Sequence, residues 1–195
     1  MGIGHKQNSL FKTNWKHQLA SGGELRRERA GRGRRALSTK DPLLLTFKVH
    51  QSKLRRRTLR AGPSFLLINK IVKRYAGRFF VSIDQWTIQN DHIHLLVRAP
   101  RRSMFHHFHR VVAGQIAQRF ENEGLVRVTD TPKGSQKGTG LWKFRPHSRV
   151  VRGFRAYKIA LDYIRLNELE VLGKIPYRKQ RLKGLSSEEW ELLRT

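Results

Sequence analysis

The sequence predicts an α+β domain, in which elements in the order β, α, β, β, α, β, α form an antiparallel sheet with two helices on one face and a third helix on the other. Segments with an apolar residue every three or four positions alternate with short runs of β-branched and aromatic residues. Two of these runs follow each other across a short polar turn at 89–91, which indicates a hairpin. With 195 residues, 38% of them hydrophobic, the chain can form one core of roughly 100 to 150 residues.

The first half of the domain contains a strand, a helix and the hairpin. A β-branched, apolar run predicts a strand at 43–49. The turn that follows leads into a helix at about 64–76, because apolar residues recur there at four-residue spacing. Two runs rich in aromatic and β-branched residues then predict the hairpin strands, at 79–88 and 92–97.

The second half contains two longer helices and one strand. Phe105 to Phe120 repeats apolar residues at helical spacing and predicts the second helix. The segment 141–145 predicts a strand, whereas the apolar pair at 150–151 is too short to assign. The third helix starts near residue 154 and ends at Gly173, and it carries one apolar stripe composed of Phe154, Tyr157, Leu161 and Ile164.

Basic segments flank this domain. Residues 1–40 contain many cations and glycines but few aliphatic residues, so we expect a disordered basic arm. The domain itself spans 41–173, and 174–195 is a basic tail with a short helix near its end.

The charge indicates a polyanionic partner. The chain has 41 Lys and Arg against 14 Asp and Glu, a formal net charge of +27, which nucleic acid offsets best. We expect no membrane insertion, because the apolar runs are far too short to span a bilayer. The absence of Cys excludes disulfides, Cys-ligated zinc and a thiol nucleophile.

Two histidines, His92 and His94, form the sharpest local motif. In a strand, residues i and i+2 point to the same face, so both imidazoles can converge on one divalent cation. His107 and His109 have the same spacing but lie in the second helix, where they project about 200° apart and cannot share a metal. The spacing alone leaves a purely structural His92–His94 pair open.

Tyr163 is the candidate nucleophile. It lies about 140° away from the centre of the apolar stripe, which falls near Tyr157, so Tyr157 is expected in the core and Tyr163 outside it. Asn167 follows one turn later on the same flank and could supply a third metal ligand. A half-exposed tyrosine beside an ordinary polar residue is the alternative.

The segment Asn90–Leu96 with its two histidines, followed some seventy residues later by Tyr163–Asn167, resembles the HUH superfamily of single-tyrosine transposases, particularly the REP-associated tyrosine transposases of bacteria. The likeness covers about 41–173. It implies a ferredoxin-like βαββαβ core. It also implies that His92, His94 and Asn167 bind Mg²⁺ or Mn²⁺, while Tyr163 attacks single-stranded DNA. Members of the family commonly have Pro-Asn before the first histidine, where this chain has Asn90 and Asp91.

The resemblance implies an endonuclease and transesterase that cleaves and rejoins hairpin-containing single-stranded DNA through a 5′-phosphotyrosine. We expect a bacterial, cytoplasmic, nucleoid-associated protein and leave a homodimer open. The expected phosphate contacts are cationic side chains outside the apolar stripes: Arg101, Arg102, Lys143, Arg145, Arg149 and Arg152. The alternative is a non-catalytic module that binds RNA or DNA, because such a module would have much the same composition.

Overall fold

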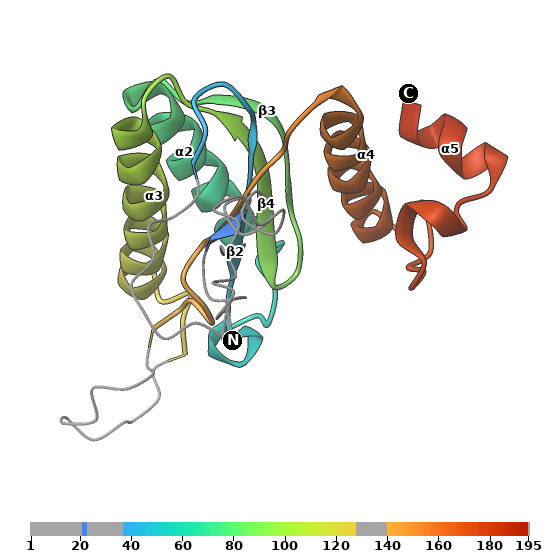
Figure 1. The fold of residues 1–195 in the computed structure, drawn as a ribbon. Coiled ribbons are helices and arrows are strands. Elements are labelled where there is room, and N and C mark those ends of the chain that lie inside the picture. Colours follow the sequence, from blue (N-terminus) through green and yellow to red (C-terminus); the bar gives the residue numbers. More distant parts are fainter. Residues whose placement is uncertain (1–20, 23–36, 128–139, 195) are drawn as a thin grey trace, which may run out of the picture.

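The computed structural model describes residues 21–22, 37–127 and 140–194, and these form an antiparallel sheet with helices on both faces (Figure 1). The five strands are β1 (Ser21–Gly22), β2 (Leu43–Lys48), β3 (Ser82–Ile88), β4 (His92–Arg98) and β5 (His147–Val150). The helices are α2 (Gly62–Arg78), α3 (Arg102–Asn122), α4 (Phe154–Val171) and α5 (Ser187–Arg194), with short 3₁₀ turns η1 (Gln51–Lys53) and η2 (Arg181–Gly184).

The strand order is that of a ferredoxin-like sheet. The strands lie in the order β1-β5-β2-β4-β3, and every neighbouring pair is antiparallel. From β2 to β5 the chain therefore follows the predicted βαββαβ order, and β4 lies between β2 and β3. The predicted fold class is confirmed. Within the described ranges, no helix combines the length and the apolar character needed to cross a bilayer.

The main core lies between the sheet and the helices α2 and α3, which cover one face together (Figure 1). Alternate residues of β2 and β4 point into it, as the period of a half-buried strand requires. The fully buried contributions from these strands and from α3 are Leu43, Leu45, Phe47, Ile93, Leu95, Val97, Phe105, Phe108, Val112, Ile116 and Phe120. The second helix and the inward face of the His92–His94 strand are thus as predicted.

Helix α4 covers the opposite face through a much smaller apolar cluster. Its buried members are Leu96, Val151, Ala160 and Ile164. Beyond α4, the C-terminal tail folds back and buries Ile175 and Leu193 against the same helix, so the predicted short terminal helix is present as α5. This side of the sheet carries the two histidines, because they alternate with the core residues of β4.

Two predictions about this half of the chain are wrong. The fourth strand of the unit is 147–150 instead of 141–145; in the latter segment Trp142 makes one isolated bridge with Val49, and its indole N–H donates to the Ala113 carbonyl at 2.9 Å. The apolar character of 141–145 comes from side chains that cap the core, among them the buried Leu141. A four-residue strand such as β5 leaves too short a pattern to identify.

The face of α4 also differs from the predicted stripe. The buried positions are Ala160, Ile164 and Asn167 on one face and Leu166, which packs against the C-terminal tail, while Phe154 is 81% exposed. The first three define the face that differs from the prediction. At 100° per residue, this face is rotated from the predicted centre by roughly 60° toward Tyr163. A small alanine and a polar asparagine contribute little to an apolar pattern, so the large side chains misplace its centre.

The predicted disordered arm, 1–40, lies largely outside the described residues. Ser21 and Gly22 form β1 and pair with Arg149 and Ser148 of β5.

Candidate active site

The two histidines of β4 lie on the α4 side of the sheet, and neighbouring strands flank His94 closely. Thr46 of β2 and Thr87 of β3 stand directly opposite His94 on either side, so the three side chains share one face. Thr46 Oγ1 lies 3.0 Å from His94 Nδ1 and forms a hydrogen bond with it. When Nδ1 carries the proton and donates it to the hydroxyl, Nε2 keeps its lone pair.

His94 is held neutral in a buried position. Burial, with a smaller influence of the neighbouring His92 and Arg181, lowers the pKa of His94 to about 3. Among the side chains that the structure describes, its Nε2 is the buried polar atom without a hydrogen-bond partner. A neutral imidazole with a free lone pair is the form that binds a metal ion.

A carboxylate orients His92 through its Nδ1, as Thr46 orients His94. Its Nδ1 lies 2.6 Å from Asp91 Oδ1, and since a carboxylate only accepts, Nδ1 is the donor. The hydrogen bond with His92 holds the pKa of Asp91 at about 2, and Lys48 lies 3.2 Å from its other oxygen. The two imidazole rings are 4.5 Å apart between centroids. Both histidines thus have Nδ1 in a hydrogen bond. Histidines that bind a metal through one ring nitrogen commonly hold the other nitrogen in this way.

Tyr163 of α4 lies beside this pair, although about seventy positions separate them in the sequence. Its ring centroid is 5.5 Å from that of His94, in an edge-on arrangement. The ring is partly buried against the apolar cluster under α4. The expectation that it lies outside the core is therefore only half right, because the rotated face of α4 brings Tyr163 to the boundary of the buried surface.

Asn167 adjoins Tyr163, but its amide oxygen is engaged. Its Nδ2 donates to the Tyr163 carbonyl at 2.7 Å, and its Oδ1 accepts from Arg181 Nη2 at 2.6 Å. Arg181 also donates to both carboxylate oxygens of Glu170, at 2.7 and 2.9 Å. To bind a metal ion, the Asn167 oxygen has to exchange the guanidinium for the cation.

Arg181 is a site residue that sequence reasoning missed. Its guanidinium lies over the ring of Tyr163, 5.2 Å from the centroid, and over that of Tyr177, 5.1 Å away. Its backbone has a φ of 56°, in the left-handed region that residues other than glycine seldom adopt. One arginine in a basic tail gives no sequence signal, whereas a strained backbone supported by several side-chain contacts is typical of a functional position.

A groove of about 580 Å³ opens from the His94–Tyr163 pair along α4 and β5. Its walls are largely apolar, with Val151, Ala156 and Ile159 among them, and Arg149 and Arg152 bring positive charge to it. The groove thus combines an apolar surface with cationic groups, the two features that bases and phosphates of an unpaired strand require.

The other predicted phosphate contacts lie elsewhere. Arg101 and Arg102 stand at the start of α3, beyond the end of β4 opposite His92, and Lys143 lies next to the end of β2, where its N–H donates to the Lys48 carbonyl at 2.8 Å. Arg145 follows Lys143 in the segment before β5. These four residues do not line the groove.

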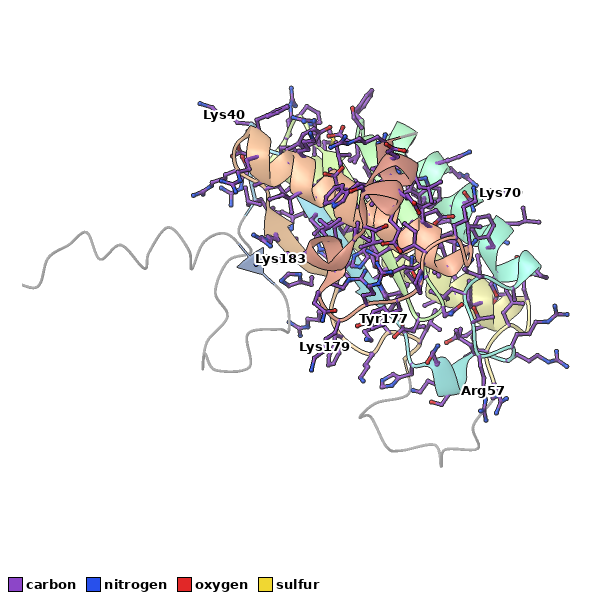
Figure 2. All side chains as sticks on the ribbon, turned by 90° about the vertical axis from the view of Figure 1, so that its right-hand side faces the viewer. Lys40, Arg57, Lys70, Tyr177, Lys179 and Lys183 are labelled. Atoms are coloured by element: carbon purple, nitrogen blue, oxygen red, sulfur yellow. The ribbon has the colours of Figure 1, made fainter. Side chains whose placement is uncertain are left out.

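Positive charge also extends well beyond the site. Figure 2 faces the α4 side and shows Lys40, Arg57 and Lys70 projecting at widely separated points of the outline.

The donor atoms suit a divalent cation with open coordination positions. Within the described ranges, no three side chains of the His, Cys, Asp and Glu types come together as a metal cluster. The site instead offers two imidazole nitrogens, with the Asn167 amide oxygen one helical turn from the phenol. Two histidines with one oxygen ligand leave room for substrate oxygens around a cation.

Comparisons with known proteins place this geometry in context. Residues 48–142 match the family of IS200-like transposases, a segment that includes both histidines but ends before Tyr163. The resemblance to single-tyrosine transposases that the sequence indicates is thereby confirmed. The comparison with curated proteins gives no match.

The solved structures that are similar to the chain include two transposases. The first is a REP-associated tyrosine transposase bound to a REP hairpin, which is 16% identical, covers 75% of this chain and 76% of its own, and superposes with a TM-score of 0.52. The second is a candidate transposase of Deinococcus radiodurans R1, also 16% identical, covering 67% of this chain and 92% of its own at a TM-score of 0.42. The first shows a common fold, and the family match supports a transposase function.

Proposed function

We propose that this protein cleaves and rejoins single-stranded, hairpin-containing DNA through a covalent 5′-phosphotyrosine formed on Tyr163, with Mg²⁺ or Mn²⁺ as cofactor. One observation carries the proposal: the unpartnered, buried Nε2 of His94 belongs to a ring next to the ring of Tyr163. A buried nitrogen without a partner is costly unless a ligand binds it. The transposase family match agrees with this chemistry.

His92, His94 and Asn167 would hold the cation. When bound, it polarises the scissile phosphate and offsets the charge that develops on the phosphate oxygens. Thr46 and Asp91 fix the two imidazoles by holding their Nδ1 atoms, so that both Nε2 atoms are available to the cation.

Tyr163 would act as the nucleophile. Its phenolic oxygen attacks the phosphorus and loses its proton, while the bond from phosphorus to the 3′-oxygen breaks and that oxygen leaves as a hydroxyl. The 5′-phosphate then remains linked to the tyrosine as a diester. Attack by the 3′-hydroxyl of another strand reverses these bond changes, releases Tyr163 and joins the two strands. The reaction is therefore a transesterification that needs no nucleotide cofactor.

The groove beside Tyr163 would receive the unpaired strand. Arg149 and Arg152 provide contacts for phosphates, which contribute affinity without reading sequence. The apolar walls of the groove offer a surface for unstacked bases. The similar transposase bound to a REP hairpin supports hairpin DNA as the partner.

The test is a search for the covalent intermediate. Labelled single-stranded hairpin DNAs are incubated with the protein and Mn²⁺, and the denatured products are examined for protein attached to a 5′ end. Tyr163→Phe should lose the adduct and keep hairpin binding. Tyr157→Phe is the matched control, because it makes the same change on the same helix and should retain the adduct.

If wild-type protein binds Mn²⁺ and hairpins but forms no adduct across many hairpins, the protein is a non-catalytic nucleic-acid-binding module. If Tyr163→Phe leaves every activity intact, Tyr163 is not the nucleophile.

A further inference from the structure

Helix α4 needs more than its apolar contacts to hold one position on the sheet. The cluster beneath it has four buried members, all aliphatic, whereas the opposite face of the sheet has an extensive core with several buried aromatic rings. A small aliphatic contact tolerates sliding and rotation, because it has no directional preference. Polar contacts with fixed partners set register where an apolar surface does not.

Such contacts join the C-terminal half of α4 to the end of β3. The Thr87 hydroxyl donates a hydrogen bond to the carboxylate of Glu168. Gln89 Nε2 donates to the backbone carbonyl of Asn167 at 2.8 Å and to Thr87 Oγ1 at 3.2 Å. Thr87 is 3% and Gln89 7% exposed, so these groups have little access to water as an alternative partner.

Arg60 adds a weaker contact from the loop before α2. Its Nη1 donates to the Ile88 carbonyl at 2.9 Å and lies 3.4 Å from Glu168 Oε1. At this distance the contact with Glu168 is an ion pair between partly exposed groups, and its contribution is small.

The position of this cluster relative to the site is informative. Thr87 stands directly opposite His94 in the sheet, and Asn167 and Glu168 follow Tyr163 by one helical turn. The hydroxyl of Thr87 therefore connects β3, the strand paired with the histidine strand, to the tyrosine helix through a single hydrogen bond to Glu168.

We propose that Thr87, Gln89 and Glu168 are positioning residues, which lock α4 in one register on the sheet and so place Tyr163 next to the histidine pair of its own chain. None of them contacts the reacting atoms. Their kinetic role rests on the proposed function, but their effect on the position of α4 does not.

The variants separate the hydrogen bonds from the charge. Glu168→Leu removes the acceptor for Thr87, whereas Glu168→Gln keeps an oxygen acceptor and loses only the charge that faces Arg60. Gln89→Met removes the donor to α4 at nearly constant size. Gln85→Met is the matched control, because it makes the same change in β3, the strand that leads into Gln89, at a residue outside this cluster.

A distance measurement tests the register directly. The chain contains no cysteine, so Lys158→Cys on α4 and Lys73→Cys on α2, both exposed, give a specific pair of spin labels. We expect a narrow distance distribution in the wild-type background, with Gln85→Met and with Glu168→Gln. Glu168→Leu and Gln89→Met should broaden or shift it. Unchanged, narrow distributions in both of these variants would overturn the proposal.

Single-turnover adduct formation tests the consequence for chemistry. A misplacement of about 1 Å can lower a rate on the order of 100-fold, so we expect losses of about 10- to 100-fold for Glu168→Leu at saturating hairpin. The Kd for Mn²⁺ alone and the Kd for the hairpin should stay within about threefold, and Glu168→Gln should restore most of the rate. Equal loss of rate in Glu168→Gln and Glu168→Leu would contradict a positioning role through Thr87.

The two measurements separate this proposal from the proposed function. If the wild-type protein forms no adduct while the label distances respond as expected, the catalytic account fails and the locking of α4 stands. If adduct forms in every variant at the wild-type rate and the label distances stay narrow, the locking fails and the catalytic account stands.

Discussion

Thr46→Val tests whether the hydrogen bond between Thr46 and His94 prepares the imidazole for a metal ion. The change keeps the shape of the side chain and removes the hydroxyl that lies 3.0 Å from His94 Nδ1. The imidazole is 7% exposed, so water cannot readily replace the lost partner. A buried polar group left without its hydrogen bond costs about 1–3 kcal/mol, which corresponds to about 5- to 150-fold in an equilibrium constant. Loss of a side chain that hydrogen-bonds to a metal ligand typically lowers metal affinity by about 10- to 100-fold, which falls within this range.

We therefore expect the Kd of Thr46→Val for Mn²⁺ to rise about 10- to 100-fold, measured by calorimetry or from the free Mn²⁺ signal in electron paramagnetic resonance. Thr58→Val is the matched control, because the Thr58 hydroxyl bonds to Asn90 Oδ1 at an exposed position. Circular dichroism confirms that each variant is folded. A folded Thr46→Val that binds Mn²⁺ as tightly as wild type would refute the argument that Thr46 selects the metal-binding tautomer of His94.

Three further predictions concern the tail, the α4 contact and the groove. Arg181→Met should tighten Mn²⁺ binding, because it removes a positive charge near His94 and releases the Asn167 oxygen. Titration with Mn²⁺ in the presence and absence of Asn167→Ala measures this effect. Unchanged binding in Arg181→Met would argue against Asn167 as a ligand. Ile164→Ala, at a fully buried position, should lower the free energy of unfolding by about 2–5 kcal/mol in urea titrations, and a loss below about 1 kcal/mol would show that α4 packs loosely. Replacing Arg149 and Arg152 with alanine should weaken single-stranded DNA binding. The slope of the logarithm of the binding constant against the logarithm of the salt concentration should fall in magnitude by about 1.4, at about 0.7 per phosphate contact. An unchanged slope would show that the strand binds elsewhere.

Periodicity predicted most of the fold, because most elements bury one clear face. The alternation in β4 placed Ile93 in the core and the histidines opposite, and the spacing in α3 identified its buried side. Two features of the fold were not predicted. The short β5 contains only four residues and gives no alternation to measure, and the buried face of α4 includes Ala160 and Asn167, which an apolar pattern does not register.

In the site, too, local spacing identified some residues and missed others. Local spacing identified His92 and His94 on one face of a strand and placed Asn167 one turn after Tyr163. The residues that orient them, Thr46 and Arg181, come from a distant strand and from the tail. These contacts depend on strand register and on how the tail folds back, and neither leaves a periodic signal in the chain.

The central claim is that Tyr163 itself becomes linked to DNA, and mass spectrometry of the trypsin-digested reaction tests it most directly. Cleavage after Lys158 and Arg165 releases the peptide 159–165, whose single tyrosine is Tyr163, while Tyr157 lies in the preceding peptide. We predict that the added mass of a 5′-phosphorylated nucleotide fragment appears on the peptide 159–165 and only in the presence of Mg²⁺ or Mn²⁺. Nucleotide attached to the Tyr157 or Tyr177 peptide instead, or no covalent product from protein that binds both hairpin and metal, would contradict the account.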